Sequence, residues 1–236
     1  MQAEALSHTG LVRPGNEDYY IVNMEKGLFA VADGMGGHQA GEIASHLALE
    51  ALAEKLFSDS SGDPLSRILA ASTFANEVVY RSSLSSQDRN GMGTTLTVFW
   101  VNGNKGYLTH IGDSRAYLFR NGQLKVLTND HSYVGELVRN GEITIEEARQ
   151  HPYRNILTRA LGTNSVAEID TWEMDLFEGD CLLLCTDGLY EVIEDDELAM
   201  ILSRYQDLAK ATRELINLAL ARGGPDNITV VLVRYE

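Results

Sequence analysis

The chain has 236 residues, of which 44% are hydrophobic and 22% are charged, a length and composition that allow a full hydrophobic core and exclude a low-complexity protein. Its 34 Asp and Glu residues outnumber its 19 Lys and Arg residues, and the formal net charge of -15 argues against nucleic acid or anionic membranes as partners. The opening segment MQAEALSHTG lacks the basic and apolar regions of a signal peptide, and no apolar stretch is long enough to span a membrane. We therefore expect a cytoplasmic protein.

In chain order, the first predicted elements are three short strands and two amphipathic helices. The strands cover about residues 2–7, 19–24 and 28–32, and the helices cover about residues 39–57 and 64–82. Pro64 suits the first turn of the second helix, because proline has no N–H group that would need a partner within the helix.

Three strands and a hairpin follow in the middle of the chain. The strands cover residues 94–101, 105–111 and 115–120. Asn121-Gly122 then predicts a two-residue hairpin turn. Residues 131–162 interrupt the strands and indicate two short helices and a loop, the second helix beginning with a capping box of Thr144 and Glu147. Such an insertion is typical of a mobile, substrate-facing element.

The last third of the chain returns to strands and ends with two helices and a closing strand. The strands cover about residues 168–174, 181–186 and 228–234, and the helices cover about residues 195–203 and 207–221. Because helices and strands come in blocks, antiparallel sheets flanked by helices are expected rather than a doubly wound parallel sheet. No long Pro- or Gly-rich linker divides the chain, so residues 1–236 are predicted to form one domain.

Carboxylates stand at the ends of the longest apolar runs. Asp33 follows LFAVA, Asp113 follows YLTHIG, Asp187 follows CLLLCT, and Asp226 precedes ITVVLV. If these strands pair antiparallel, the end of one lies beside the beginning of its neighbour, and the four carboxylates converge at one rim of a sheet. Clustered carboxylates repel one another unless a cation joins them, and hard oxygen ligands select Mg²⁺, Mn²⁺ or Ca²⁺. The pattern predicts a metal-dependent enzyme.

Eight short motifs in a fixed order connect the chain with a known family. They are Arg13-x-x-Asn16-Glu17-Asp18, Asp33-Gly34-Met35-Gly36-Gly37-His38, Gly93-Thr94-Thr95, Gly112-Asp113-Ser114-Arg115, Asp130-His131-Ser132, Leu157-Thr158-Arg159-Ala160-Leu161-Gly162, Asp187-Gly188-Leu189 and Gly224-Pro225-Asp226-Asn227-Ile228-Thr229. With these motifs the chain resembles the metal-dependent protein phosphatases of the 2C type, in their bacterial branch. The resemblance runs nearly from end to end, and any one motif alone would be a weak signal.

The resemblance implies an α+β fold. It is a four-layer α-β-β-α sandwich, in which two antiparallel β-sheets are flanked by antiparallel helix pairs. Residues 1–236 would form a single phosphatase catalytic domain, and a small helical flap insertion at about 131–165 would lie beside the active site.

The resemblance also implies a centre of two Mn²⁺ or Mg²⁺ ions. By match to the motifs, Asp33 would bridge the two ions, and the backbone carbonyl of Gly34 would bind one of them. Asp187 and Asp226 would hold the second ion. Glu17 would act through metal-bound water.

Three further roles follow from the same resemblance. Asp113, together with Asp187, matches the place where bacterial members hold a third, weaker ion. Arg13 matches the arginine that grips the substrate phosphate, a role that suits the parallel donors of a guanidinium. Met35 stands where eukaryotic members carry the acid histidine. The general acid could instead be His38 or a metal-bound water, and His38 could equally be a loop residue with a structural role.

The function that this resemblance implies is a serine/threonine phosphoprotein phosphatase. A water activated by the two metal ions would attack the phosphomonoester directly, because neither Cys181 nor Cys185 begins the C-x5-R loop of phosphatases with a cysteine nucleophile. Its partners would be phosphoserine and phosphothreonine proteins and a cognate bacterial serine/threonine kinase, whose action it would reverse. We expect a monomer.

Other interpretations have less support in the sequence. A pseudo-phosphatase that only docks partners would be expected to lack a metal aspartate, whereas Asp33, Asp187 and Asp226 are all present. No EF-hand loop supports a structural Ca²⁺ site, and Gln39 stands where a nucleotide-binding G-x-G-x-x-G motif has its third glycine. A small phosphomonoester stays an open alternative substrate, because these residues recognise phosphate and not the rest of the molecule.

Overall fold

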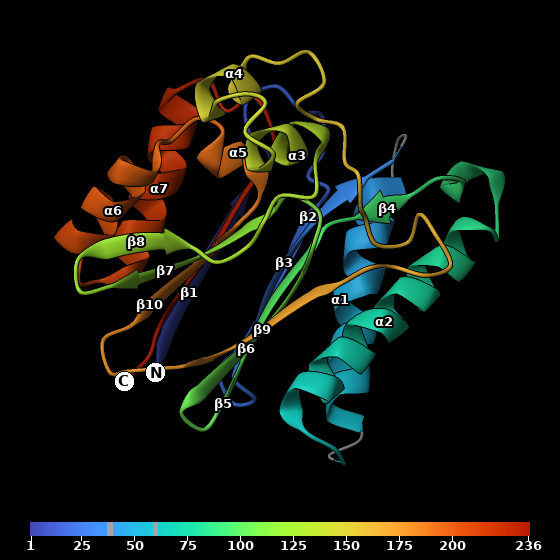
Figure 1. Cartoon of the computed structure of the whole chain (residues 1–236), viewed down its shortest axis with the longest axis horizontal. Helices are drawn as coiled ribbons and strands as arrows, with labels where there is room; N and C mark the ends of the chain where they lie inside the picture. The colour runs from blue at the N-terminus through green and yellow to red at the C-terminus, as the bar shows by residue number, and fades with distance from the viewer. Residues whose placement is uncertain (37–39, 59–60) are drawn as a thin grey trace.

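Two antiparallel sheets lie face to face between layers of helices in the computed structural model, which describes residues 1–36, 40–58 and 61–236 (Figure 1). The first sheet has the strand order β1 (Gln2–His8), β11 (Ile228–Arg234), β10 (Cys181–Cys185), β7 (Arg115–Arg120) and β8 (Gln123–Val126). The second has the order β2 (Asp18–Asn23), β3 (Leu28–Met35), β5 (Leu96–Asn102), β6 (Lys105–Ile111) and β9 (Asp170–Asp175), and the short β4 (Gly93–Thr94) pairs with β3.

A pair of long helices covers the outer face of each sheet (Figure 1). On the second sheet the pair is α1 (Ala40–Ser58) and α2 (Pro64–Ser83), and on the first sheet it is α6 (Asp195–Arg204) and α7 (Leu208–Ala221). Shorter helices are α3 (Tyr133–Arg139), α4 (Ile145–Arg149), α5 (Asp187–Tyr190) and the 3₁₀ turn at Gln87–Arg89. The four-layer α-β-β-α arrangement therefore agrees with the expected fold class.

Strand β3 illustrates why the central strands are apolar on both faces. Successive side chains of a strand point to opposite sides, so Leu28 and Ala30 face α1 and α2, whereas Phe29 and Val31 face the other sheet. All four side chains are fully buried. A strand covered on both faces by other layers has to be a continuous apolar run, which is the pattern that predicted it.

Local signals in the sequence are confirmed at several element ends. Helix α2 begins at Pro64, and the side chain of Asp63 caps it by accepting a hydrogen bond from the Ser66 N–H group. Helix α4 has the predicted capping box of Thr144 and Glu147. The sequence pattern did not predict β4 and α5, because both are too short to show a period of their own. Strand β9 covers residues 170–175, close to the predicted range of about 168–174.

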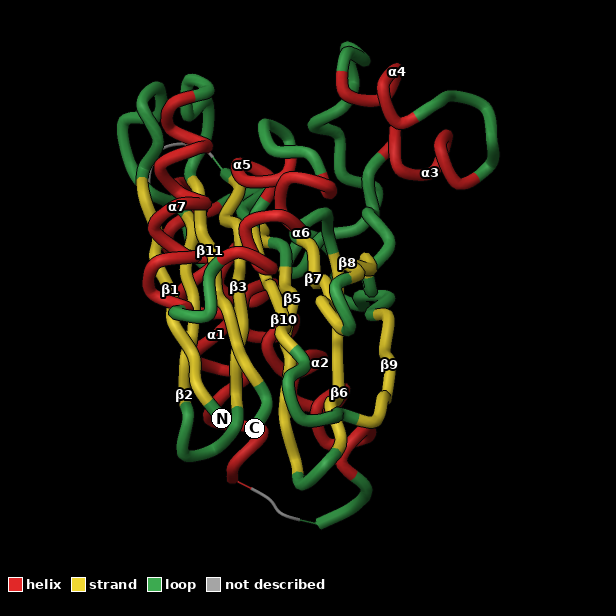
Figure 2. Tube along the Cα trace, turned by 90° about the vertical axis from the view of Figure 1, so that its left-hand side faces the viewer, coloured by secondary structure: helices red, strands yellow, loops and turns green. Residues whose placement is uncertain are grey.

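Helices α3 and α4 follow β8 and precede β9, which places them inside the predicted flap insertion. Both lie beyond the strand ends, on the side of the molecule where α5 begins (Figure 2). The flap therefore stands over the end of the sandwich at which the predicted carboxylates are found. The assignment of residues 1–236 to a single catalytic domain stays a prediction. In the parts that the structure describes, no helix is long and apolar enough to cross a membrane.

Candidate active site

The carboxylates at the strand ends lie at the flap end of the sandwich. Asp33 stands near the end of β3, and Asp113 lies between β6 and β7. Asp187 is the first residue of α5, two positions after the last residue of β10. Asp226 lies two positions before β11. Because β10 and β11 are antiparallel neighbours, the end of β10 and the start of β11 meet at the same edge of the sheet.

The pKa shifts of the two central aspartates report their surroundings. Burial raises the pKa of Asp33 well above its ordinary value. Neighbouring charges raise it further, and they are those of Asp18, Asp187, Asp113 and Asp226. The pKa of Asp187 is raised in the same way, first by burial and then by the charge of Asp113. Carboxylates that shift one another's pKa share one electrostatic neighbourhood, so the fold brings these side chains together.

Asp113 and Asp18 form the two flanks of this neighbourhood. Burial raises the pKa of Asp113 to about 7, with smaller contributions from the charges of Asp130 and Glu191. Burial likewise raises the pKa of Asp18 to about 7, although hydrogen bonds from Thr229 and Thr186 oppose the shift. Without a cation nearby, both groups therefore keep their proton up to a higher pH than a solvent-exposed aspartate does.

Two carboxylate oxygens in the cluster have no hydrogen-bond partner among the described residues. They are Oδ1 of Asp187 and Oδ1 of Asp18, and both are buried. Leaving such an oxygen unpaired costs about 1–3 kcal/mol, so nearly all buried polar atoms in proteins find a partner. A divalent cation would satisfy both the unpaired oxygen and the excess negative charge of the cluster.

The residues present therefore fit a metal centre by their chemistry. In residues 1–36, 40–58 and 61–236, no group of three or more His, Cys, Asp or Glu side chains is arranged so that it could hold a metal ion by itself. Backbone carbonyls and water molecules would have to complete the coordination of an ion, as is common for Mg²⁺ and similar hard cations.

The backbone of Asp33 is held by the Gly93-Thr94-Thr95 motif. The Asp33 N–H group donates to Oγ1 of Thr95 at 2.9 Å, and the Asp33 carbonyl accepts from Oγ1 of Thr94 at 2.8 Å and from the Thr95 N–H group at 2.9 Å. Both threonines are buried. They therefore serve to place Asp33, which explains a motif that has no chemistry of its own.

Gly34 lies where three segments approach closely. Its N–H group donates to the Glu17 carbonyl at 3.1 Å, and a Cβ atom at Gly34 would lie 2.1 Å from the carbonyl oxygen of Gly41. A Cβ atom at Gly41 would in turn lie 2.8 Å from Oε2 of Glu17. Both glycines are required by this packing, which fixes the Glu17 backbone against the start of α1 and the end of β3. Burial raises the pKa of Glu17, and the charge of Arg13 opposes the shift.

Arg13 belongs to the cluster through a contact that the sequence did not indicate. Its Nη2 atom donates to Oδ2 of Asp226 at 2.6 Å, between residues that are 213 positions apart. The Arg13 side chain is 48% exposed. A guanidinium has five N–H donors, so a bond to one carboxylate leaves donors for a second anion. In this structure Arg13 therefore pairs with an expected metal ligand.

Two outcomes differ from the expected set of site residues. His38 lies outside the described residues. Asp18 has no role in the expected set, yet it is buried and lies opposite Asp33 in the pairing of β2 with β3. It accepts hydrogen bonds from the hydroxyls of Thr186 and Thr229. An acidic residue at the start of a strand that neighbours Asp33 was the signal that could have identified it.

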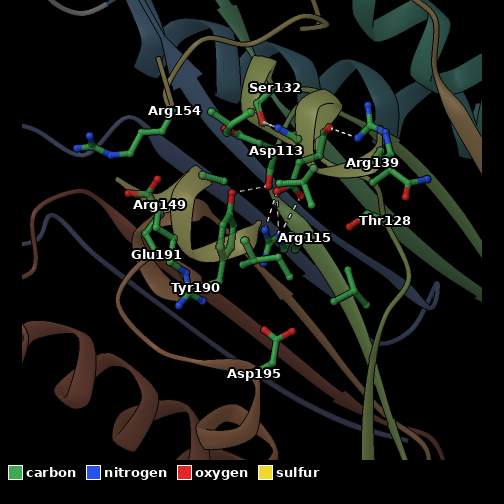
Figure 3. A pocket seen from close by; sticks show the side chains of 18 of the residues that line it. Asp113, Arg115, Thr128, Ser132, Arg139, Arg149, Arg154, Tyr190, Glu191 and Asp195 are labelled. Atoms are coloured by element: carbon green, nitrogen blue, oxygen red, sulfur yellow. Dashed lines mark hydrogen bonds and ion pairs between the residues drawn. The ribbon is translucent and has the colours of Figure 1, made fainter. Parts of the chain in front are cut away.

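A cavity of about 620 Å³ lies between the flap and the segment α5–α6, next to Asp113 (Figure 3). At its inner end Arg115 binds Asp130 through two of its nitrogens, at 2.9 and 2.6 Å, and its guanidinium lies 3.6 Å from the ring centroid of Tyr190. The Tyr190 hydroxyl donates to the Asp113 carbonyl at 3.0 Å. The cavity thus borders the carboxylate cluster at Asp113, and Asp33, Asp187 and Asp226 do not line it.

Two contacts join flap residues to other residues that line this cavity. Arg149 of α4 forms an ion pair with Glu194, which precedes α6. Arg139 of α3 donates to the Asp130 carbonyl at 2.6 Å. Both contacts are exposed to solvent, where an ion pair such as that of Arg149 contributes about 0–1 kcal/mol.

Comparison with known proteins agrees with this geometry. Residues 14–232 match the profile of the family described as protein phosphatase 2C. The serine/threonine protein phosphatase PstP of Mycobacterium tuberculosis is 43% identical over 228 residues, which cover 97% of this chain and 44% of that protein. The serine/threonine phosphatase stp of Listeria monocytogenes is 39% identical over 248 residues, which cover 100% of this chain and 96% of that protein. The chain thus spans less than half of PstP and nearly all of stp.

Solved structures show the same fold. The crystal structure of M. tuberculosis PstP superposes with a TM-score of 0.92 at 42% identity and covers 100% of this chain and 98% of that one. The catalytic domain of PstP in complex with two manganese ions superposes with a TM-score of 0.89 at 40% identity, covering 98% of this chain and 96% of that one. The α+β sandwich predicted from the motifs is confirmed, and this chain belongs to the protein phosphatase 2C family.

Proposed function

We propose that this chain is a metal-dependent serine/threonine phosphoprotein phosphatase that acts in the cytoplasm. The observation that carries the proposal is the buried carboxylate cluster around Asp33 and Asp187, in which Oδ1 of Asp187 has no hydrogen-bond partner among the described residues. Its relatives are named serine/threonine phosphatases, and one of them is solved in complex with two manganese ions. Both facts support the same function.

The ligands of two Mn²⁺ or Mg²⁺ ions would come from the residues that the motifs indicate. Asp33 would bridge the ions, the Gly34 carbonyl would bind one of them, and Asp187 and Asp226 would hold the second. Glu17 would act through metal-bound water. When bound, the ions would supply an acidified water molecule and positive charge for the phosphate oxygens.

A third, weaker ion would lie at Asp113. Among the neighbouring charges, that of Asp113 raises the pKa of Asp187 most, and Asp113 also lines the cavity under the flap (Figure 3). The pKa of Asp113 is about 7, so a nearby cation would stabilise its charged form at neutral pH, which supports an ion at this residue.

Arg13 would hold the phosphate group of the substrate. Its half-exposed guanidinium lies at the edge of the cluster, beside Asp226, so a phosphate bound there would be reached by its remaining donors. Two parallel N–H···O bonds fix both the position and the orientation of a phosphate. Arg13 would therefore align the phosphorus atom with the attacking water.

The nucleophile would be water rather than a side chain. Cys181 and Cys185 are both buried, and burial raises the pKa of Cys181 to about 11 and the pKa of Cys185 further still. A thiol with such a pKa is not a thiolate at neutral pH and is a poor nucleophile. This supports direct hydrolysis without a phosphoenzyme.

His38 and a metal-bound water are the two candidates that we propose for the general acid of the leaving oxygen. If His38 has this role, His38→Ala should lower turnover mainly on substrates with poor leaving groups, such as a phosphothreonine peptide. Equal losses on the peptide and on an aryl phosphate, whose leaving group needs no proton, would exclude the acid role and favour a loop residue or a water.

The experiment that tests the whole proposal is phosphate release from a phosphothreonine peptide with Mn²⁺, with Mg²⁺ and with excess chelator. Turnover that requires the metal ion and stops on chelation would establish the phosphatase. A folded protein that shows no turnover with either metal ion would contradict it. A cognate serine/threonine kinase would then produce the phosphorylated proteins on which this enzyme acts. We propose that the enzyme is a monomer.

A further inference from the structure

Asn227 connects the two segments that carry Arg13 and Asp226. It directly follows Asp226 and is 5% exposed. Its Nδ2 atom donates to the Thr9 carbonyl at 2.9 Å and to the Gly15 carbonyl at 2.9 Å. Its Oδ1 atom accepts from the Glu17 N–H group at 2.8 Å. One buried amide is therefore bonded to three points of the loop from Thr9 to Glu17.

The orientation of this amide follows from its partners. Carbonyl oxygens can only accept and a backbone N–H group can only donate, so the nitrogen of Asn227 must face Thr9 and Gly15 and its oxygen must face Glu17. Both hydrogens of the amide are used, one at each end of the stretch from Thr9 to Gly15. The side chain thus holds both ends of the stretch that contains Arg13.

Two backbone features press the same loop against Asp226. The Leu11 N–H group donates to the Gly224 carbonyl at 2.8 Å. Gly10 has a φ of +79°, and a Cβ atom there would lie 2.1 Å from the carbonyl oxygen of Asp226. The loop therefore lies directly on the segment before β11. Arg13 itself is exposed and is bound to this segment only through Asp226, so its position depends on the anchored loop ends.

We propose that Asn227 is a positioning residue, which holds Arg13 and Glu17 in register with Asp226 and thereby sets the affinity of the site for phosphate. The inference rests on the proposed phosphatase function, because it assigns Arg13 to the substrate phosphate. Asn227 touches neither the substrate nor an ion in this scheme and acts through the loop. Its removal should therefore weaken phosphate binding more than it slows the chemical step.

A buried asparagine elsewhere in the chain provides a matched control. Asn76 of α2 is 1% exposed, and its Nδ2 atom donates to the carbonyls of Asn164 and Ser165 at 3.1 and 3.4 Å. Its Oδ1 atom accepts from the Gly162 N–H group at 2.7 Å. The two side chains make the same types of bond, but Asn76 holds a loop that contains none of the proposed site residues. Asn76→Ala thus reports the loss of stability alone.

The experiment compares Asn227→Ala with Asn76→Ala in steady-state hydrolysis of p-nitrophenyl phosphate with saturating Mn²⁺. For Asn227→Ala we expect KM and the inhibition constant of inorganic phosphate to rise about ten-fold or more, the equivalent of one lost hydrogen bond to a charged group. Its kcat should fall less than KM rises. For Asn76→Ala both constants should stay within about two-fold of the wild-type values, at a comparable loss of thermal stability.

Hydrogen exchange of the metal-free proteins provides a readout that does not depend on activity. Asn227→Ala should speed exchange in the peptide that contains residues 9–17, and above all at the Glu17 amide, which loses its acceptor. Asn76→Ala should leave this peptide unchanged. Asn227→Asp tests the same point if the Ala variant fails to fold, because it keeps an acceptor for Glu17 but turns a carboxylate oxygen towards two carbonyls.

Two results would overturn the inference while the proposed function stands. One is a wild-type KM and phosphate inhibition constant in the Asn227 variants, and the other is unchanged exchange in residues 9–17. A wild-type protein that hydrolyses no phosphate ester would instead refute the proposed function. Exchange in residues 9–17 would then still decide whether Asn227 holds the loop.

Discussion

Asp187→Asn should make the metal-free protein more stable than the wild type and the metal-loaded protein less stable than the wild type. Asp187 is buried among other carboxylates, and one of its oxygens has no hydrogen-bond partner among the described residues. Asparagine has nearly the same shape but no charge. Without a metal ion the substitution therefore removes repulsion from Asp33, Asp113 and Asp226, whereas in the loaded protein it removes a proposed ligand.

The magnitude follows from the buried charge that the substitution removes. A pKa shift of one unit corresponds to about 1.4 kcal/mol, and the pKa of Asp187 is raised well above its ordinary value, so at neutral pH the metal-free variant should be more stable than wild type by at least about 1.4 kcal/mol. For a chain of this size, 1 kcal/mol shifts the Tm by about 2–4 °C. The gain should grow as the pH rises. The pKa of Asp187 is raised in the folded protein above the ordinary value of 3.8, so its charge destabilises the fold only above that value and increasingly towards the folded-state pKa.

Metal binding contributes in the opposite direction. An ion at one hundred times its dissociation constant stabilises the folded protein by about 2.7 kcal/mol, and a variant without the site loses most of this term. Thermal unfolding of both proteins, with a chelator and with Mn²⁺ at pH 7.5, measures the two effects together. Asp88→Asn is a suitable control, because Asp88 is exposed in the 3₁₀ turn at Gln87–Arg89.

A variant that is less stable than wild type with the chelator, and that still gains the full wild-type shift with Mn²⁺, would refute this reasoning. It would mean that Asp187 is well solvated or paired and is not a metal ligand. The same variant should show no metal-dependent turnover of phosphothreonine peptide.

Three further outcomes are expected. Arg13→Lys should raise KM for p-nitrophenyl phosphate about ten-fold while kcat changes less, because a single ammonium cannot make two parallel bonds to phosphate; unchanged kinetics would remove Arg13 from the phosphate site. Asp113→Ala should weaken catalysis more than it weakens the two tight Mn²⁺ sites in a calorimetric titration, and loss of the tight sites would exclude a separate third ion. His110 is buried with a pKa lowered by burial from 6.5 to about 3, so below pH 6.5 the unfolded chain binds a proton that the folded chain does not, and stability falls by up to about 1.4 kcal/mol per pH unit. His110→Gln should flatten that acid limb in urea titrations between pH 6.5 and 4.5, and an equal slope in both proteins would contradict the shift.

Local sequence was enough to predict most secondary structure, because its signals are local in origin. The run LFAVA, the proline at position 64 and the pair Thr144 and Glu147 each act through residues at most a few positions away. The convergence of the carboxylates at strand ends could be predicted only in part. Antiparallel pairing brings the end of β10 beside the start of β11, whereas Asp33 and Asp187 belong to different sheets and meet only because the two sheets pack face to face.

The partners of the site residues could not be predicted in this way. Arg13 and Asp226 are 213 positions apart, and the bonds of Asn227 to Thr9 and Gly15 span 218 and 212 positions. No period or local motif reports which loops meet at the end of a sandwich. Asp18 shows the same limit, since its raised pKa depends on burial beneath residues of the other sheet.

The sequence by itself determined the elements, the family and the kinds of residue at the site, because periodicity, turn chemistry and motif order are properties of neighbouring positions. Only the tertiary structure decided that Arg13 contacts Asp226, that one asparagine holds the loop before Glu17, and that a cavity opens between Asp113 and the flap. Burial and charge act through distance in space, and the fold alone sets those distances.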